Sequence, residues 1–157
     1  MAWQLSYRLT CEVFAFTAIG AAARDFKYRD QIRDSSASAH RNIAEGYGLY
    51  YPGEFARFCG YAIGSLEETK SSLIDGRDRA YLDEKLFSRL WNLAGAAERA
   101  TKNLKFYLDS KSVKRNRRAS APKDPKNRGK KNPDVGAERN PEGRRKRNLR
   151  VRRRREL

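Results

Sequence analysis

The residues with the clearest chemical potential are the arginines and lysines near the C-terminal end of the chain. The stretch from Arg144 to Arg155 reads RRKRNLRVRRRR. A guanidinium group pairs with a phosphate through its planar fork and also stacks on bases, and unbalanced positive charge attracts phosphates whatever the base sequence. This chemistry predicts binding to nucleic acid. The predicted contact residues are Lys114, Arg115, Arg117, Arg118, Lys130, Lys131, Arg144, Arg145, Lys146, Arg147, Arg150, Arg152, Arg153, Arg154 and Arg155.

Other reactive side chains lack the partners that catalysis or metal binding requires. His40 has no nucleophile and no second metal ligand at helical spacing. The neighbouring carboxylates Glu67 and Glu68 would point about 100° apart on a helix, so they cannot share a proton or a metal. Cys11 and Cys59 lie among apolar or small residues and are expected to be buried thiols in a reducing compartment. The sequence has no P-loop, dinucleotide fingerprint or nucleophile elbow. We expect no enzyme, no metal and no cofactor.

The net charge divides the chain into two parts. Of the 157 residues, 35 are Lys or Arg and 19 are Asp or Glu, which gives a net charge of +16. Residues 1–110 hold 15 basic and 14 acidic residues, whereas residues 111–157 hold 20 basic and 5 acidic residues. The second part also contains four of the five prolines and almost no large apolar residue, a composition typical of disorder. We expect a folded domain over 1–110 and a disordered, Arg/Lys-rich tail over 111–157. A tail that binds nothing specifically is the alternative.

Apolar residues in the first part repeat at intervals of three and four, which is the periodicity of helices. Helices are predicted over residues 3–23, 25–44, 52–76 and 83–108, with Asp83 as the N-cap of the last one. Four helices with short connections predict an all-α, antiparallel up-and-down four-helix bundle. No stretch approaches the roughly 20 apolar residues of a membrane span, and polar residues interrupt the apolar N-terminal stretch, so a cytoplasmic protein is expected.

A motif with two glycines ends the second predicted helix. Its residues are Asn42, Glu45, Gly46 and Gly48. A glycine just past the last turn adopts the left-handed conformation that caps free carbonyls, so the motif predicts a helix stop. Glu45 would then meet the negative end of the helix dipole, and Arg41 or Arg57 is expected to offset its charge. A subunit contact or a ligand site is the alternative interpretation of the motif.

Four aromatic residues follow closely: Tyr47, Tyr50, Tyr51 and Phe55. Packing at the end of the bundle is the favoured interpretation of this group. Stacking on nucleic-acid bases, as in proteins that bind single strands, is the alternative.

Three sequence blocks resemble one known family. NIAEGYG at Asn42–Gly48 is followed by EFARF at Glu54–Phe58 and by AIGSLEE at Ala62–Glu68. Their order and spacing resemble those of the four-helix-bundle family that includes the large-subunit ribosomal RNA intervening-sequence proteins. The accessory variability determinant of diversity-generating retroelements is a relative of that family. The resemblance covers about residues 3–108 and does not cover the tail.

The resemblance implies an antiparallel four-helix bundle that assembles into a homopentamer with a central channel and has no known enzymatic activity. For the retroelement relative it also implies binding to nucleic acid and to a reverse transcriptase. The chain departs from the family pattern at Asp34 and Leu49, where basic residues are common, and at Ala39-His40, where proline is common. We hypothesise that the tail supplies the positive charge that the bundle has lost.

Together, these observations predict a non-enzymatic, oligomeric helical bundle that binds nucleic acid electrostatically, with RNA favoured over DNA and a reverse transcriptase as a candidate partner. The alternative is a structural or protein–protein interaction module with no role in nucleic-acid binding.

Overall fold

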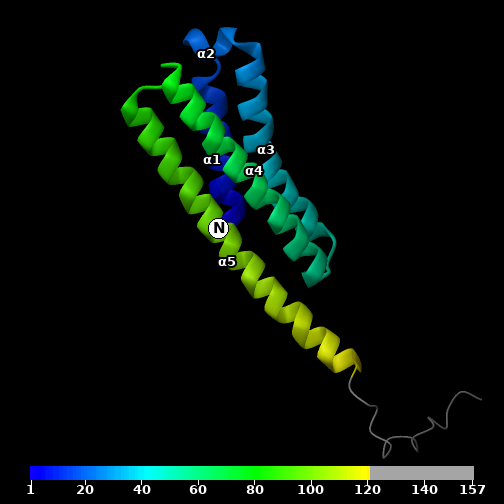
Figure 1. Cartoon of the computed structure of the whole chain (residues 1–157). Coiled ribbons are helices and arrows are strands. Elements are labelled where there is room, and N and C mark those ends of the chain that lie inside the picture. The colour runs from blue at the N-terminus through cyan, green and yellow to red at the C-terminus, as the bar shows by residue number, and fades with distance from the viewer. Residues whose placement is uncertain (121–157) are drawn as a thin grey trace, which may run out of the picture. The chain divides into compact units, whose positions relative to one another are not determined.

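The computed structural model describes residues 1–120, with side chains up to residue 113, and these residues are helical almost throughout. The helices are α1 (Ala2–Phe16), α2 (Gly20–Arg24), α3 (Phe26–Gly48), α4 (Pro52–Asp78) and α5 (Glu84–Ser120). Helix α2 is short, and the other four pack lengthwise as an antiparallel bundle (Figure 1). Residues 1–120 contain no strand. The prediction of an all-α four-helix bundle is confirmed.

The core consists of apolar side chains that recur at helical spacing in all four long helices. Its largest fully buried apolar residues are Leu9, Val13, Ile32, Leu66, Leu73 and Leu90. Helix α3 presents small residues to the interior, and Ser36 and Ala39 have no exposed surface. Small side chains let α3 approach α4 closely enough for Thr69 Oγ1 to donate to Ser35 Oγ at 3.1 Å. Because these buried hydroxyls are hydrogen-bonded, they add specificity to the contact without leaving unpaired polar atoms.

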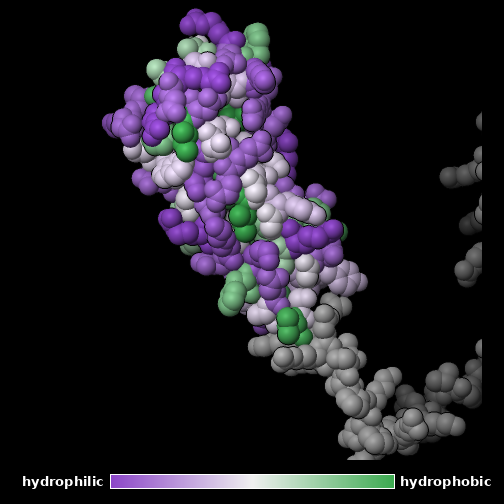
Figure 2. Space-filling view, in the orientation of Figure 1, coloured by the Kyte–Doolittle hydropathy of each residue, from purple (hydrophilic) through white to green (hydrophobic). Residues whose placement is uncertain are grey.

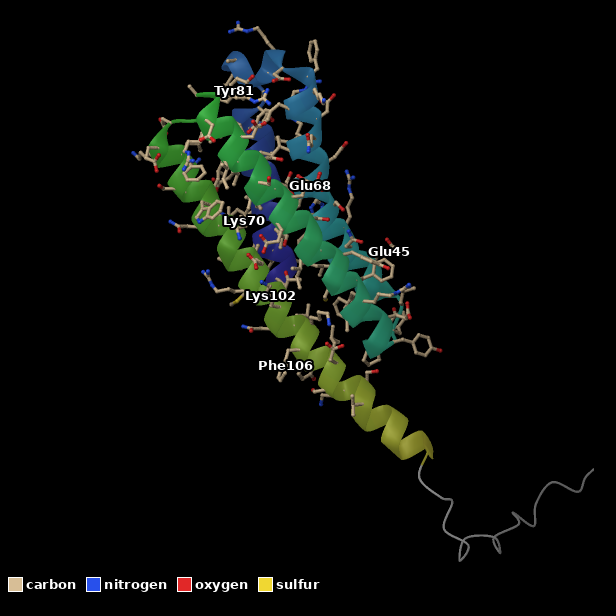
Figure 3. All side chains as sticks on the ribbon, viewed as in Figure 1. Glu45, Glu68, Lys70, Tyr81, Lys102 and Phe106 are labelled. Carbon is tan, nitrogen blue, oxygen red and sulfur yellow. The ribbon has the colours of Figure 1, made fainter. Side chains whose placement is uncertain are left out.

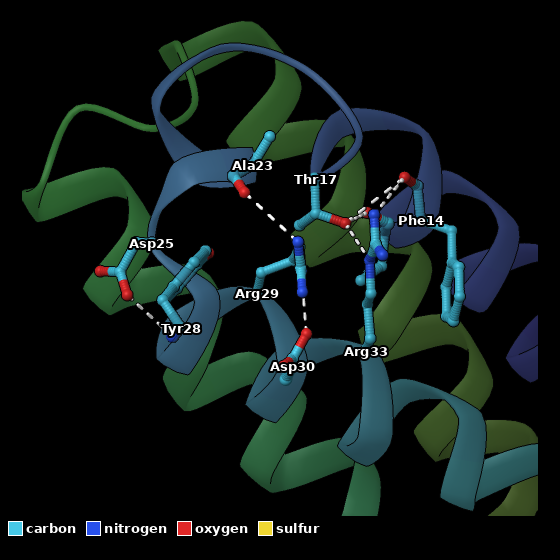
Figure 4. Close-up of polar contacts among 9 residues, drawn as sticks. Phe14, Thr17, Ala23, Asp25, Tyr28, Arg29, Asp30 and Arg33 are labelled. Carbon is cyan, nitrogen blue, oxygen red and sulfur yellow. Dashed lines mark hydrogen bonds and ion pairs between the residues drawn. The ribbon is translucent and has the colours of Figure 1, made fainter.

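The first predicted helix, residues 3–23, is interrupted in the structure, because α1 ends at Phe16 and the separate short helix α2 covers Gly20–Arg24. Thr17 is buried, and its hydroxyl donates to the Val13 carbonyl at 2.7 Å and accepts from Arg33 Nε at 2.7 Å (Figure 4). A threonine that bonds back to the carbonyl four residues earlier weakens a helix at that point. Gly20 then starts α2 with a φ of +70°, which glycine adopts at little cost.

The polar groups between α1 and α3 are bonded within the fold. Residues 17–25 form what we call the α1–α3 corner. Asp25 caps α3 by accepting from the Tyr28 amide at 3.1 Å, and its other oxygen accepts from Tyr81 at 2.9 Å and from Arg79 at 3.2 Å. The Tyr28 amide, with help from the Tyr81 hydroxyl, lowers the pKa of Asp25. The charged cap therefore holds the start of α3 next to the end of α4.

Helix α3 continues through Gly48, so the predicted stop at residue 44 comes too early. Gly46 is buried within the helix, and a Cβ there would lie 2.7 Å from both Phe55 Cδ2 and Phe58 Cβ of α4. The glycine therefore makes room for α4, a tertiary reason that the local sequence does not reveal. The left-handed residue of the following turn is Tyr50, with a φ of 58°. The prediction that a glycine caps this helix is wrong.

Helix α5 begins as predicted and ends later than predicted. Asp83 Oδ1 accepts from the Leu86 amide at 2.7 Å, which confirms the N-cap. The helix runs to Ser120 instead of Leu108 because residues 109–120 contain no proline or glycine and are rich in lysine and arginine, which are good helix formers. The predicted boundary after Ser110 thus lies inside α5. In Figure 1 the end of α5 extends past the turn between α3 and α4.

Candidate functional site

The glycine-containing motif lies along the contact between α3 and α4. Asn42 Nδ2 donates to the Ser38 carbonyl at 2.9 Å and to Ser38 Oγ at 3.0 Å. Ser65 of α4 donates to the same Ser38 hydroxyl at 3.0 Å. Asn42 therefore supports the α3–α4 contact within the helix, and the predicted role in stopping α3 is wrong.

The two charged residues of the motif do not meet. Arg57 pairs with Glu54 at 2.6 Å and lies over the rings of Phe58 and Tyr61, at 5.5 and 5.9 Å from their centroids. Glu45 is exposed on α3 (Figure 3) and forms no ion pair within the described part of the chain. Glu45 lies in the last turn of α3, which ends at Gly48, and neither Arg41 nor Arg57 forms an ion pair with it in the described part of the chain, so the predicted compensation is not made.

The aromatic residues after the motif are largely open to solvent. Tyr47 and Tyr50 are 72% and 86% exposed, and Tyr51 is exposed as well. The ring of Tyr47 stands edge-on to Phe55, with the centroids 6.1 Å apart, and Phe55 packs against the core. We call Tyr47, Tyr50 and Tyr51 the tyrosine turn. The favoured interpretation, packing at the bundle end, is wrong for Tyr50 and applies to Tyr47 only at one ring edge.

The tyrosine turn leads directly into α4, whose first turn lies against α5. A Cβ on Gly53 would be 3.1 Å from Ser112 Oγ. Next to this contact, Lys111 Nζ lies 5.1 Å above the centroid of the Tyr107 ring, where a cation is attracted by the ring face. The basic part of α5 thus begins beside the tyrosine turn.

The predicted phosphate-binding residues fall into two groups. Four belong to α5 but follow residue 113, the last one whose side chain is described: Lys114, Arg115, Arg117 and Arg118. The others lie outside the described residues: Lys130, Lys131, Arg144, Arg145, Lys146, Arg147, Arg150, Arg152, Arg153, Arg154 and Arg155.

The surface near the end of α5 also exposes apolar side chains. Figure 2 shows a mostly hydrophilic surface on which apolar residues appear along the lower part, over α5. Phe106 is 79% exposed (labelled in Figure 3), and Tyr107 and Val113 are exposed nearby. Exposed apolar side chains therefore lie on the same stretch of α5 as Lys111.

His40 belongs to an aromatic cluster on α1 that sequence reasoning missed. Trp3 and Tyr7 stack with their centroids 5.1 Å apart, and both rings stand edge-on to the imidazole. His40 Nδ1 lies 3.2 Å from Thr10 Oγ1, which also donates to the Ser36 carbonyl. Burial, and then the nearby Arg41, lowers the pKa of His40. Trp3 and Tyr7, four residues apart, share one face of α1, and their meeting with His40 depends on the packing of α1 on α3.

Helices α4 and α5 are joined by an ion cluster. Lys70 Nζ lies 3.1 Å from Glu98 and 3.1 Å from Glu67, and 5.0 Å above the Trp91 ring centroid. Lys102 (labelled in Figure 3) pairs with the other oxygen of Glu98. The bond from Lys102, followed by that from Lys70, lowers the pKa of Glu98 to about 2. This cluster stabilises the bundle and satisfies one member of the carboxylate pair noted in the sequence.

The described residues give no sign of a metal centre or a membrane span. In residues 1–113 no three His, Cys, Asp or Glu side chains are placed to hold a metal ion together. Across the described helices, none is both long and apolar enough to cross a membrane. Cys59 is buried, as predicted, but Cys11 is exposed, because it lies on the outer face of α1.

Comparisons with known proteins agree with this architecture. A family model described as 23S rRNA-intervening sequence protein matches residues 1–103. The chain is also similar to a crystal structure from Bacteroides thetaiotaomicron, that of a protein with unknown function from the S23 ribosomal protein family. The TM-score is 0.61 and the sequence identity 16%, over 67% of this chain and 98% of that chain, a likeness that shows the fold alone. No match is found among curated proteins.

Proposed function

We propose that this chain, which belongs to the 23S rRNA-intervening sequence protein family, is a non-enzymatic RNA-binding protein. Its phosphate contacts come from the end of α5 and from the residues that follow. The distribution of charge carries the proposal: residues 111–157 hold 20 basic and 5 acidic residues, beside 15 and 14 in residues 1–110. Phosphates attract such an excess whatever the base sequence. The description of the family favours RNA as the nucleic acid.

The bundle itself offers few cations that are free to bind phosphate. Nine of its basic residues already pair with carboxylates: Arg8, Arg29, Arg57, Lys70, Arg77, Arg79, Arg89, Lys102 and Lys105. Arg33 donates to Thr17 and to the Phe14 carbonyl. A phosphate would have to compete with these partners, which supports a scaffold role for the bundle and a binding role for the basic C-terminal part.

The test compares two full-length variants with equal loss of charge. One replaces Arg153, Arg154 and Arg155 with glutamine. The matched control replaces Arg24, Lys27 and Lys85, which are exposed, form no ion pair in the described part, and lie at the end of the bundle opposite the tyrosine turn. Fluorescence anisotropy with a labelled RNA strand at several salt concentrations measures both.

We expect the first variant to bind more weakly, with a salt slope that falls by about 0.7 for each phosphate that the variant no longer neutralises. The control should bind like the wild-type protein. Equal affinity of the first variant and the wild type would contradict the proposal. An equal weakening in both variants would show that only the net charge matters.

We further propose that the chain forms a homo-oligomer, a pentamer by family resemblance. Trp3, Tyr7 and Phe14 leave an aromatic strip partly exposed along α1, and burial of such side chains between subunits is favourable. Several basic tails on one particle would raise the avidity for a long RNA. Light scattering on the full-length protein tests this; a monomer at tens of micromolar would contradict it.

The second candidate function is docking of another protein, with a reverse transcriptase as the partner that the family relative suggests. The same aromatic strip on α1 is the observation that favours it, since exposed aromatic residues are common in protein interfaces. Under this alternative, tail substitutions leave RNA affinity low and unchanged, whereas Tyr7→Ser abolishes co-purification with the partner.

A further inference from the structure

The left-handed residue of the α3–α4 turn is a tyrosine whose ring does nothing for the fold. Tyr50 has a φ of 58° and is 86% exposed. In residues 1–113 its ring takes part in no hydrogen bond, ion pair or ring contact. Glycine or asparagine adopts this backbone conformation at lower cost, and glycines stand two and four residues earlier, at Gly48 and Gly46. Stability of the turn therefore does not account for a tyrosine at this position.

A second tyrosine beside it is held in place and still open. Tyr47 makes a T-shaped contact with Phe55, and Phe55 packs against buried residues that include Ile43 and Leu108. The Tyr47 ring is thus restricted on the side of Phe55, while most of the side chain faces solvent. A ring with restricted motion and an open face loses little conformational freedom when a flat ligand stacks on it.

Positive charge lies on the part of α5 that the first turn of α4 contacts. The first turn of α4 contacts α5 at Ser112, and Lys111 lies directly before this contact. Lys114 and Arg115 follow Lys111 at three and four residues along the same helix. Of the nearby acidic groups, Glu54 pairs with Arg57 and Asp109 with Lys105, whereas Glu45 of α3 forms no ion pair in the described part of the chain. Open aromatic faces next to cations are the combination that binds single-stranded nucleic acid, where bases stack and phosphates meet the positive charge.

We propose that the tyrosine turn is a stacking site for unpaired bases of a single strand, with Tyr47 and Tyr50 as the stacking residues and the basic end of α5 as the neighbouring phosphate contact. The inference rests on the proposed function and deepens it, because it separates recognition of single strands from attraction to any polyanion. In a duplex each base is already stacked between its neighbours, so no base face along the duplex is free to stack on these tyrosines.

The experiment measures the affinity of full-length variants for two probes, an oligouridine strand and an RNA duplex with the same number of phosphates. Tyr50→Ser and Tyr47→Ser are each expected to weaken binding to the single strand about tenfold. Binding to the duplex should change less than twofold. Tyr50→Phe retains the ring and is expected to bind the single strand like the wild type. Tyr61→Ser, at an exposed tyrosine farther along α4, is the matched control and should bind like the wild type.

Folding of the variants is controlled by Tyr50→Gly. Glycine adopts a positive φ freely, so this variant is expected to melt no lower than the wild type while losing single-strand affinity as Tyr50→Ser does. If the wild type binds neither probe, the proposed function fails and this inference with it. If the wild type binds both probes and the serine variants are unchanged, only this inference is overturned, and the turn becomes a candidate surface for a protein partner. An equal loss of affinity for strand and duplex also overturns it.

Discussion

The two ends of α3 reverse the chain in different ways. At the α1–α3 corner the left-handed residue is Gly20, and the polar groups around it are bonded within the fold, Arg33 to Thr17 and Asp25 to the Tyr28 amide. At the tyrosine turn the left-handed residue is Tyr50, whose ring is bonded to nothing in the described part of the chain. Both turns need a residue in the left-handed conformation. The conformational free energy of that residue is low for Gly20 and higher for Tyr50.

This difference indicates where to look for function in this bundle. Backbone strain and exposed aromatic surface both reduce stability, and they persist where another requirement maintains them. The α1–α3 corner shows that this sequence can build a reversal whose left-handed residue is a glycine. The tyrosine turn combines a left-handed tyrosine with open rings, which is the reason for placing the proposed stacking site there.

The largest expected effect lies between the two ends, at Glu98. Its pKa in the folded protein is about 2, against an ordinary value of 4.5. Because the folded value is the lower one, the stabilisation is complete above about pH 4.5 and is lost as the pH falls towards 2, by an amount on the order of 2–3 kcal/mol. Urea unfolding at several pH values measures this loss, and Glu98→Gln should flatten the profile over that range.

Acid unfolding also tests whether the two ends belong to one cooperative unit. We expect a single transition, because the Glu98 cluster joins α4 to α5 along the body of the bundle. Two transitions would show that the ends unfold separately, and the contrast between them would then concern two independent units.

The next effect concerns two glycines near the tyrosine turn. Gly46→Ala is expected to cost about 1–3 kcal/mol, because its Cβ would meet Phe55 and Phe58 at 2.7 Å. Gly48→Ala is the matched control: nothing lies within 4 Å of its Cβ, and alanine in a helix should gain about 0.5–1 kcal/mol. Chemical denaturation measures both. Destabilisation of both variants would mean that the turn needs glycine for flexibility and not for space.

The smallest effects test the comparison of the two turns directly, because substitutions at the two ends of α3 are expected to change the stability in opposite directions. Gly20→Ala should lose about 1–2 kcal/mol, since alanine is strained at a φ of +70°. Tyr50→Gly should gain up to about 1 kcal/mol by relieving the same strain at a φ of 58°. Thermal melting of the two variants and of the wild type measures these changes in stability. Destabilisation by Tyr50→Gly would show that the tyrosine side chain supports the fold, and the contrast between the ends would disappear.

The regular parts of the fold could be predicted because they follow local rules. Leu9, Val13, Ile32 and Leu90 lie at helical spacing and are buried, and Asp83 caps α5 as an aspartate at that position should. The features that differ from the sequence predictions depend on contacts between distant segments or on a basic composition that is compatible with helix. Gly46 is explained only by the phenylalanines of α4, and α5 is longer than predicted because lysine and arginine are good helix formers.

The candidate site was only partly visible in the sequence. The tyrosines were singled out, yet their exposure and the position of Tyr50 in the left-handed region depend on where α3 ends. The basic residues were found by counting charges alone. That four of them lie on α5 followed from the absence of proline and glycine before residue 121, a signal that the sequence does contain.

The two tryptophans of the chain occupy different helix contacts, and this makes the protein its own optical label. Trp3 is partly exposed where α1 meets α3 at His40, whereas Trp91 lies under the Lys70 ammonium between α4 and α5. In Trp91→Phe the remaining emission, from Trp3, reports on the contact between α1 and α3. In Trp3→Phe the remaining emission, from Trp91, reports on the contact between α4 and α5. With acrylamide as a quencher, loosening of either side of the bundle can be followed by intrinsic fluorescence without attaching a dye.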